Sequence, residues 1–194
     1  MFFICILFFR PHFGCRKYIS KVIHKLLPAL KNDLGDWLVE TRIKTSQLVY
    51  ILICHMEETS VITQHSDSLI ALFFHGVKDS ESVVIKNMCR SARIYGYFVP
   101  PKTWIPMISQ RLLAQALDTD LLILSHIIIG SDPQLLRGNI EDLAMTLQDD
   151  SVSLTLNVSS LTGLFKVHNE LKRGKKSILA GQCTLFASKT KIHV

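Results

Sequence analysis

The amino-acid sequence predicts an all-α fold, an α-solenoid in which antiparallel helix pairs stack on one another. Three observations lead to this prediction: a two-helix pattern occurs twice in tandem, apolar residues recur at steps of three and four, and only nine glycines and six prolines are available for turns. Steps of three and four place side chains on one face of a helix, whereas an all-β sandwich needs many more turns.

Two copies of the helix pair lie between Leu26 and Phe98. With Asp36 aligned on Asp79, a shift of 43 residues, four further positions match in pairs: Leu27 with Ile70, Leu30 with Phe73, Thr41 with Val84, and Thr45 with Met88. A period in the forties that contains two helices is typical of HEAT and armadillo repeats. Neither helix of such a unit can bury its apolar face alone, so the units are expected to stack.

The first repeat is predicted over residues 17–55. Its first helix, from about Tyr18 to Asp33, has one apolar face made of Ile19, Val22, Ile23, Leu26, Leu27, Leu30 and Leu34. Pro28 removes one helical hydrogen bond and bends the axis, but a proline in the first helix is familiar in HEAT repeats. Asp36 and Asp79 each precede a second helix, whose free N–H groups a carboxylate can cap. We predict that five residues serve the structure of the repeat: Pro28, Asp36, Trp37, Asp79 and Val84.

Three further units follow the first. The second repeat is predicted over residues 61–98, after a polar turn from Met56 to Ser60. The third repeat, over 100–130, opens with two prolines and ends in an almost wholly apolar helix, which is typical of a buried helix. A partial fourth repeat, over 132–150, opens with Asp132 as cap and Pro133 at the first helical position. The predicted solenoid therefore spans residues 15–150.

Both ends of the chain differ from the repeats. Residues 1–14 begin with the apolar run MFFICILFF, which is far shorter than the roughly 20 residues that cross a bilayer. This run is either a signal-peptide core or the product of a mis-started gene. Residues 151–194 first alternate apolar and polar residues, as an extended segment does, and then lose all periodicity. Seven basic residues and one acidic residue follow Phe165, whereas residues 1–165 hold 15 of each sign. We expect an irregular or disordered basic tail.

The sequence predicts no catalytic, cofactor-binding or metal-binding site. The five cysteines are odd in number and form no CxxC pair, which is typical of free thiols in a reducing compartment. Cys54 and Cys89 lie in apolar helical stretches, where we expect buried thiols. Cys54 and His55 are adjacent on a helix, so their side chains diverge by about 100°. The acidic pair Asp118 and Asp120 lies in a predicted solvated turn. We therefore do not expect an enzyme.

Five basic side chains are the candidate partner-binding residues, and all lie on predicted second helices: Arg42, Lys44, Lys86, Arg90 and Arg93. In solenoids of this type the second helices line the concave face that binds partners. Two alternatives stay open. The residues could form an ordinary solvated helix face, and Arg42 could pair with an acidic residue of a neighbouring repeat.

Three segments carry a more specific resemblance: HKLLPALKNDLGDWLVETRIKTSQL, the stretch from Thr63 to Leu69, and VVIKNMCRSARIYGYFVPPKTW. They resemble the C-terminal HEAT repeats of the dynein axonemal assembly factor 5 family, over about residues 15–147. The resemblance implies a cytoplasmic scaffold, with no catalytic residue, that helps pre-assemble axonemal dynein arms for cilia. The implied partners are dynein heavy or intermediate chains and other assembly factors or chaperones, with no small-molecule substrate, membrane or cofactor. The alternative is a HEAT-type transport or nucleic-acid adaptor that uses the basic tail.

Overall fold

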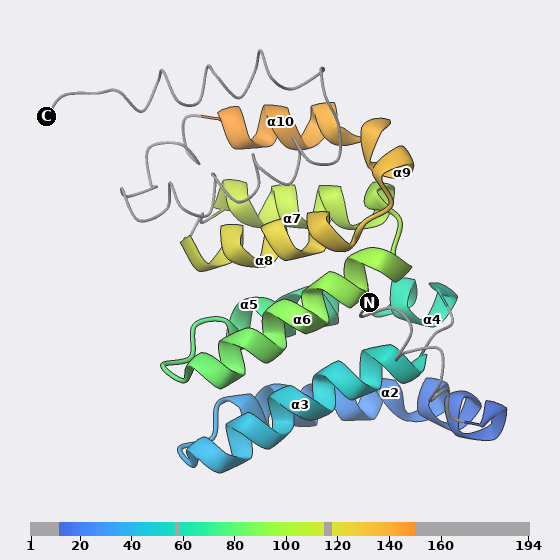
Figure 1. Cartoon of the computed structure of the whole chain (residues 1–194), viewed down its shortest axis with the longest axis vertical. Coiled ribbons are helices and arrows are strands. Elements are labelled where there is room, and N and C mark those ends of the chain that lie inside the picture. The colour runs from blue at the N-terminus through green and yellow to red at the C-terminus, as the bar shows by residue number, and fades with distance from the viewer. Residues whose placement is uncertain (1–11, 57–58, 115–117, 150–194) are drawn as a thin grey trace, which may run out of the picture.

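A computed structural model describes residues 12–56, 59–114 and 118–149, and Figure 1 shows the whole chain. The described residues form helices and no strand, which confirms the all-α prediction. Their bounds are α2 (Phe13–Leu34), α3 (Val39–Met56), α4 (Thr59–Gln64), α5 (Ser66–Gly76), α6 (Ser82–Phe98), α7 (Pro101–Ala114), α8 (Asp118–Gly130), α9 (Pro133–Arg137) and α10 (Ile140–Gln148). The predictions for residues 1–11 and 151–194 fall outside the described residues.

The helices stack in two layers (Figure 1). Helices α2, α5, α7 and α10 follow one another in the first layer, and α3, α6 and α8 follow one another in the second. Helix α2 also packs on α3, and α5 packs on α6, so these first and second helices pair across the layers. Each unit thereby covers the apolar face of its neighbours, as a HEAT solenoid requires.

Helix α2 carries the apolar face that its spacing predicts. Ile23, Leu27, Leu30 and Leu34 are buried, and Ile19 and Leu26 pack partly buried against them. The helix begins at Phe13, five residues before the predicted start. It continues through Pro28, whose ring lies on the exposed side of the helix. A proline on the solvent side gives up one hydrogen bond without disturbing the packed face.

The pairs aligned by the 43-residue shift occupy equivalent places in the core. Leu27 and Ile70 are both buried, as are Leu30 and Phe73, and Thr45 and Met88. The match is imperfect at one pair, since Val84 is fully buried but Thr41 is only partly buried.

The predicted polar turn from Met56 to Ser60 is wrong at both ends. Met56 is the last residue of α3 and is fully buried. Helix α4 already starts at Thr59, and its Ile62 is fully buried. Burial of Ile62 stabilises a short extra helix at this place. The polar residues before Ile62 predict a turn instead. His65 then separates α4 from α5.

The third unit agrees with its predicted burial, and the fourth starts where predicted. In α8 the buried side chains include Leu121, Ile123, Leu124, Ile127 and Ile128, as expected for an almost wholly apolar helix. Asp132 caps α9, where its Oδ1 accepts hydrogen bonds from the N–H groups of Gln134 at 2.7 Å and Leu135 at 3.4 Å. Two short helices, α9 and α10, make up this unit. The side chain of Thr146 in α10 hydrogen-bonds Ser109 of α7 at 2.9 Å.

Helices α6 and α8 approach each other closely enough that only glycine fits at two positions. A Cβ atom added at Gly96 would overlap the carbonyl oxygen of Ile127 and lie 2.9 Å from its carbonyl carbon. A Cβ atom added at Gly130 would overlap the carbonyl oxygen of Arg93 and lie 2.7 Å from its carbonyl carbon. Real Cβ atoms essentially never come within 3.0 Å of such neighbours. The two backbones therefore fix the spacing between the second and third units.

None of the helices in the described ranges is both long and apolar enough to cross a membrane.

Candidate partner-binding face

The outward side of the second layer presents a row of basic side chains on α6. Lys86, Arg90 and Arg93 are all exposed, at steps of four and three, and exposed Tyr97 continues the row after one more turn. Residues at these steps share one face of a helix. Helix α6 contains no aspartate or glutamate, so its exposed face carries no negative charge. Three of the five candidate partner-binding residues therefore lie together.

Lys44 lies apart from this row, on α3. Its Nζ is 2.7 Å from Oε1 of Glu40, and both side chains are largely exposed, at 72% and 78%. The hydrogen bond and charge of Lys44 hold the pKa of Glu40 below its ordinary value. An exposed pair of this kind adds little to stability and leaves no net charge at the position. Lys44 is thus a weaker candidate than the three cations of α6.

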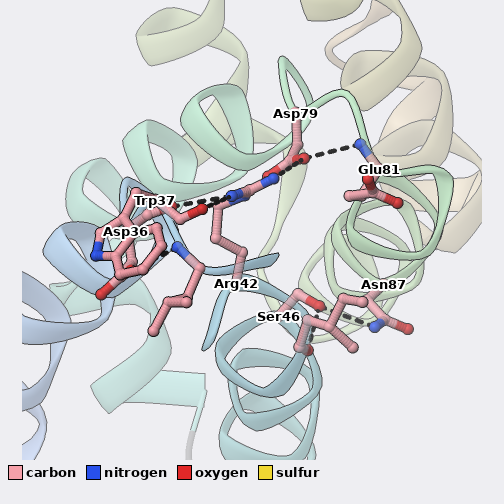
Figure 2. Close-up of polar contacts among 9 residues, drawn as sticks. Asp36, Trp37, Arg42, Ser46, Asp79, Glu81 and Asn87 are labelled. Atoms are coloured by element: carbon pink, nitrogen blue, oxygen red, sulfur yellow. Dashed lines mark hydrogen bonds and ion pairs between the residues drawn. The ribbon is translucent and has the colours of Figure 1, made fainter. Parts of the chain in front are cut away.

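Arg42 does not point to solvent with the others but bridges two repeats (Figure 2). Its Nε donates to Oδ2 of Asp79 at 2.7 Å, and its Nη2 donates to Oδ1 at 3.3 Å. Its Nη1 donates to the backbone oxygens of Asp36 at 3.0 Å and Trp37 at 3.3 Å. The side chains of the ion pair are 14% and 6% exposed. The structure therefore shows the alternative in which Arg42 pairs with an acid of the next repeat.

The ion pair shifts the protonation equilibria of both groups. The hydrogen bond to Asp79 raises the pKa of Arg42 above its ordinary value, against the opposing effect of burial. For Asp79, burial alone would raise the pKa. The hydrogen bonds from Arg42 and from the N–H of Glu81, together with the nearby positive charge, instead hold its pKa below the ordinary value. Both groups are therefore charged at neutral pH.

The two equivalent aspartates, Asp36 and Asp79, accept the same kind of hydrogen bond in the turn that precedes each second helix. Asp36 accepts a hydrogen bond from the N–H of Leu38 at 2.7 Å, and Asp79 accepts one from the N–H of Glu81 at 2.8 Å. In each case the donor directly precedes the first residue of the helix. The predicted capping of the first helical turn is therefore wrong in detail, since each carboxylate shapes the turn that leads into the helix.

A buried polar contact joins the same two repeats deeper in the interface. Asn87 of α6 donates through Nδ2 to Oγ of Ser46 in α3 at 2.9 Å (Figure 2). Both residues are at least nine-tenths buried, and the Ser46 hydroxyl donates in turn to the carbonyl of Ile43 at 2.7 Å. Sequence reasoning missed this pair. Its only signal was that small polar residues occupy otherwise apolar faces of two second helices.

The remaining predicted structural positions have contrasting environments. Val84 is completely buried in the core, whereas the Trp37 side chain is 84% exposed. Trp37 contributes to the junction through its carbonyl, which accepts a hydrogen bond from Arg42. Its ring is therefore available at the surface, beside exposed Leu38 and Val39.

Two expectations about reactive groups need correction. Cys89 is buried as predicted, but Cys54 is only partly buried, and that burial raises the pKa of its thiol to about 11. Asp120 does not lie in a solvated turn, because it is 1% exposed within α8. Its Oδ2 is 4.0 Å from Nε of Arg111, whose guanidinium lies 4.4 Å from the centre of the Phe74 ring. No group of metal-binding side chains occurs within the described ranges.

Comparison with known proteins supports the expected resemblance. The family model described as "Dynein axonemal assembly factor 5, HEAT-repeat domain" matches residues 7–189, which include much of the stretch after residue 150. The chain is 33% identical to dynein axonemal assembly factor 5 of Xenopus laevis over 143 residues, covering 74% of this chain and 17% of the relative. It is 33% identical to the Homo sapiens protein of the same name over 138 residues, covering 71% of this chain and 16% of the relative. The chain thus spans about one sixth of the length of these curated relatives.

Proposed function

Because the chain belongs to the dynein axonemal assembly factor 5 family, we propose that it acts as a non-catalytic HEAT-repeat scaffold in the cytoplasmic pre-assembly of axonemal dynein arms. The observation that carries this proposal is the family match over residues 7–189, nearly the whole chain. The stacked helices support it, because a solenoid offers an extended surface on which other chains can be held.

The proposed partners are axonemal dynein heavy or intermediate chains, and other assembly factors or chaperones. The second layer supplies the proposed binding face, since it presents the exposed cations of α6 and is built on a rigid repeat junction. Arg42 takes a structural part in this proposal, because its guanidinium is held by Asp79 and by two backbone oxygens. In this proposal Lys86, Arg90 and Arg93 make the direct contacts with the partner protein.

The test is an affinity pull-down from the cytosol of ciliating cells, read by mass spectrometry. The full chain and a chain cut after Asp150 are compared side by side. Recovery of axonemal dynein chains by both supports the proposal and places the function in the repeats. Recovery of no dynein chain by either would refute it.

The same experiment addresses a second candidate function, an adaptor that binds nucleic acid. The observation that favours the adaptor is the charge of the tail, where seven basic residues and one acidic residue follow Phe165. An adaptor of this kind should recover nucleic-acid-binding partners only with the full chain, and its binding should weaken steeply with salt.

A further inference from the structure

We infer that the outward face of α6 binds a helical segment of a partner protein that carries a row of carboxylates beside an apolar stripe. The inference deepens the proposed scaffold function, on which it rests, because it names the chemistry of the segment that the scaffold holds. The carboxylates would pair with Lys86, Arg90 and Arg93, and the apolar stripe would contact the exposed apolar side chains at the two ends of this basic row.

The charge of the row is not neutralised within the part of the chain that the structure describes. None of the three cations forms an ion pair there. Two acidic groups of the neighbouring units are engaged elsewhere: Asp79 is held by Arg42, and Glu40 is held by Lys44. Asp120 on α8 is buried, 4.0 Å from Arg111. Three exposed positive charges therefore stand in a line on a helix that contains no aspartate or glutamate, and none of them forms an ion pair within the described residues.

The spacing of the cations matches that of a second helix. Lys86 and Arg93 are seven residues apart, which corresponds to about 10 Å along a helix axis. A partner helix with glutamates at positions i, i+4 and i+7 presents its carboxylates over the same length. Arginine can hold a carboxylate through two parallel hydrogen bonds, so two of the three pairs gain geometric specificity.

Apolar side chains continue the row at both ends. Val83 is 41% exposed one turn before Lys86, and Tyr97 is 56% exposed one turn after Arg93. Ile94, beside the row, is partly buried against the core. A basic row between exposed apolar groups fits an amphipathic partner segment better than a wholly polar segment. Tyrosine is also enriched at protein–protein interfaces.

The backbone beneath the row is fixed before any partner arrives. The carbonyl of Arg93 lies against Gly130, and the carbonyl of Ile127 lies against Gly96, so α6 cannot shift relative to α8 without losing this packing. A binding surface that is already ordered loses little conformational entropy on association.

Charge distribution favours an acidic protein segment over nucleic acid or the chain's own tail. Nucleic-acid binding commonly uses six to ten phosphate contacts spread over a broad basic surface. Residues 1–165 instead hold equal numbers of acidic and basic residues, so the three cations of α6 form a short local row. The tail itself is basic and would be repelled from this row.

The test uses the full chain and a fluorescein-labelled helical peptide of about 20 residues, long enough to fold as a helix. The peptide has glutamates at i, i+4 and i+7 beside a leucine stripe, and a matched peptide has glutamine at those three positions. Binding is measured by fluorescence anisotropy against wild type and two triple variants. The first carries Lys86→Gln, Arg90→Gln and Arg93→Gln. The control removes the same charge from exposed lysines of α2, in the other layer: Lys17→Gln, Lys21→Gln and Lys25→Gln.

We expect the glutamate peptide to bind wild type and the α2 control alike, and the α6 variant to bind at least about tenfold more weakly. The glutamine peptide should bind weakly to all three proteins. Equal losses in the two variants would show that only the total charge matters, and would overturn the inference. Binding of a single-stranded RNA at the same face without binding of the glutamate peptide would overturn it as well. All three proteins should unfold at similar temperatures, because the substituted side chains are exposed.

Failure of this inference can be told apart from failure of the proposed function. If the α6 variant recovers axonemal dynein chains from cytosol as well as wild type does, the inference falls while the scaffold function stands. If wild type recovers no dynein chain but binds the glutamate peptide through α6, the surface is supported and the proposed function falls.

Discussion

The close approach of α6 and α8 leads to the prediction that Gly96→Ala destabilises the chain. Alanine normally stabilises a helix interior relative to glycine by about 0.5–1 kcal/mol. At Gly96 the added methyl group would overlap the carbonyl oxygen of Ile127 and lie 2.9 Å from its carbonyl carbon. Ordinary van der Waals contact begins near 3.4 Å, so the two helices must separate.

The cost follows from what that separation disturbs. Overpacking of a well-packed core costs about 1–3 kcal/mol, and the upper end applies here because backbone cannot rotate away as a flexible side chain can. Separation also loosens the packing of fully buried Tyr95 and Ile127. After the gain in helix propensity is subtracted, we expect a net loss of about 2 kcal/mol. For a chain of this size the midpoint of thermal unfolding should fall by about 4–8 °C.

The measurement is thermal unfolding followed by far-UV circular dichroism, with Gly14→Ala as the matched control. Gly14 lies in the first turn of α2, and a Cβ atom added there meets nothing within 4 Å. The control should therefore unfold at or slightly above the wild-type temperature. Gly130→Ala should resemble Gly96→Ala. If Gly96→Ala were as stable as Gly14→Ala, backbone contact could not be what fixes the spacing of α6 and α8.

Three other measurements test separate parts of the structure. Asp79→Asn should lower the midpoint of thermal unfolding at neutral pH. The pKa of Asp79 in the folded chain lies below its unfolded value of about 3.9, so the pairing with Arg42 stabilises the fold above that pH and is lost as the pH falls. The unfolding midpoints of wild type and variant should therefore converge in acid. Asp132→Ala removes the cap of α9 and should cost about 1 kcal/mol in urea denaturation, whereas an unchanged midpoint would show that the cap does not limit stability. Iodoacetamide should label exposed Cys15 well before Cys54, because burial raises the pKa of the Cys54 thiol to about 11. Peptide mass spectrometry can measure the two labelling rates, and equal rates would contradict the burial of Cys54.

The candidate site could be predicted from sequence only in part. The placement of Lys86, Arg90 and Arg93 on one second helix follows directly from helical spacing. The separation of these cations from Arg42 does not, because the partner of Arg42 lies 37 residues away along the chain. Only the stacking of two repeats brings Asp79 within 2.7 Å of Arg42 and turns a candidate binding residue into a structural one.

Burial of polar groups was the least predictable property. Asp120 has the sequence context of a turn, since it stands two residues after another aspartate, but it is buried beside Arg111 within a packed helix. Asn87 is a polar residue on an otherwise apolar face of α6, and its partner Ser46 lies 41 residues away in the preceding repeat. The energy that places such groups comes from partners on other elements, which local periodicity does not describe.

The pattern of residues along the chain is enough to predict the helices, the repeat and the buried faces. These properties depend on local spacing: apolar residues at steps of three and four must be covered, and a 43-residue shift must repeat the same face. The packing of the helices is needed to tell which charges form no ion pair within the described residues and how closely the repeats approach. Those features depend on distances between elements, as between Arg42 and Asp79 or between Gly96 and Ile127, and such distances exist only once the helices have packed.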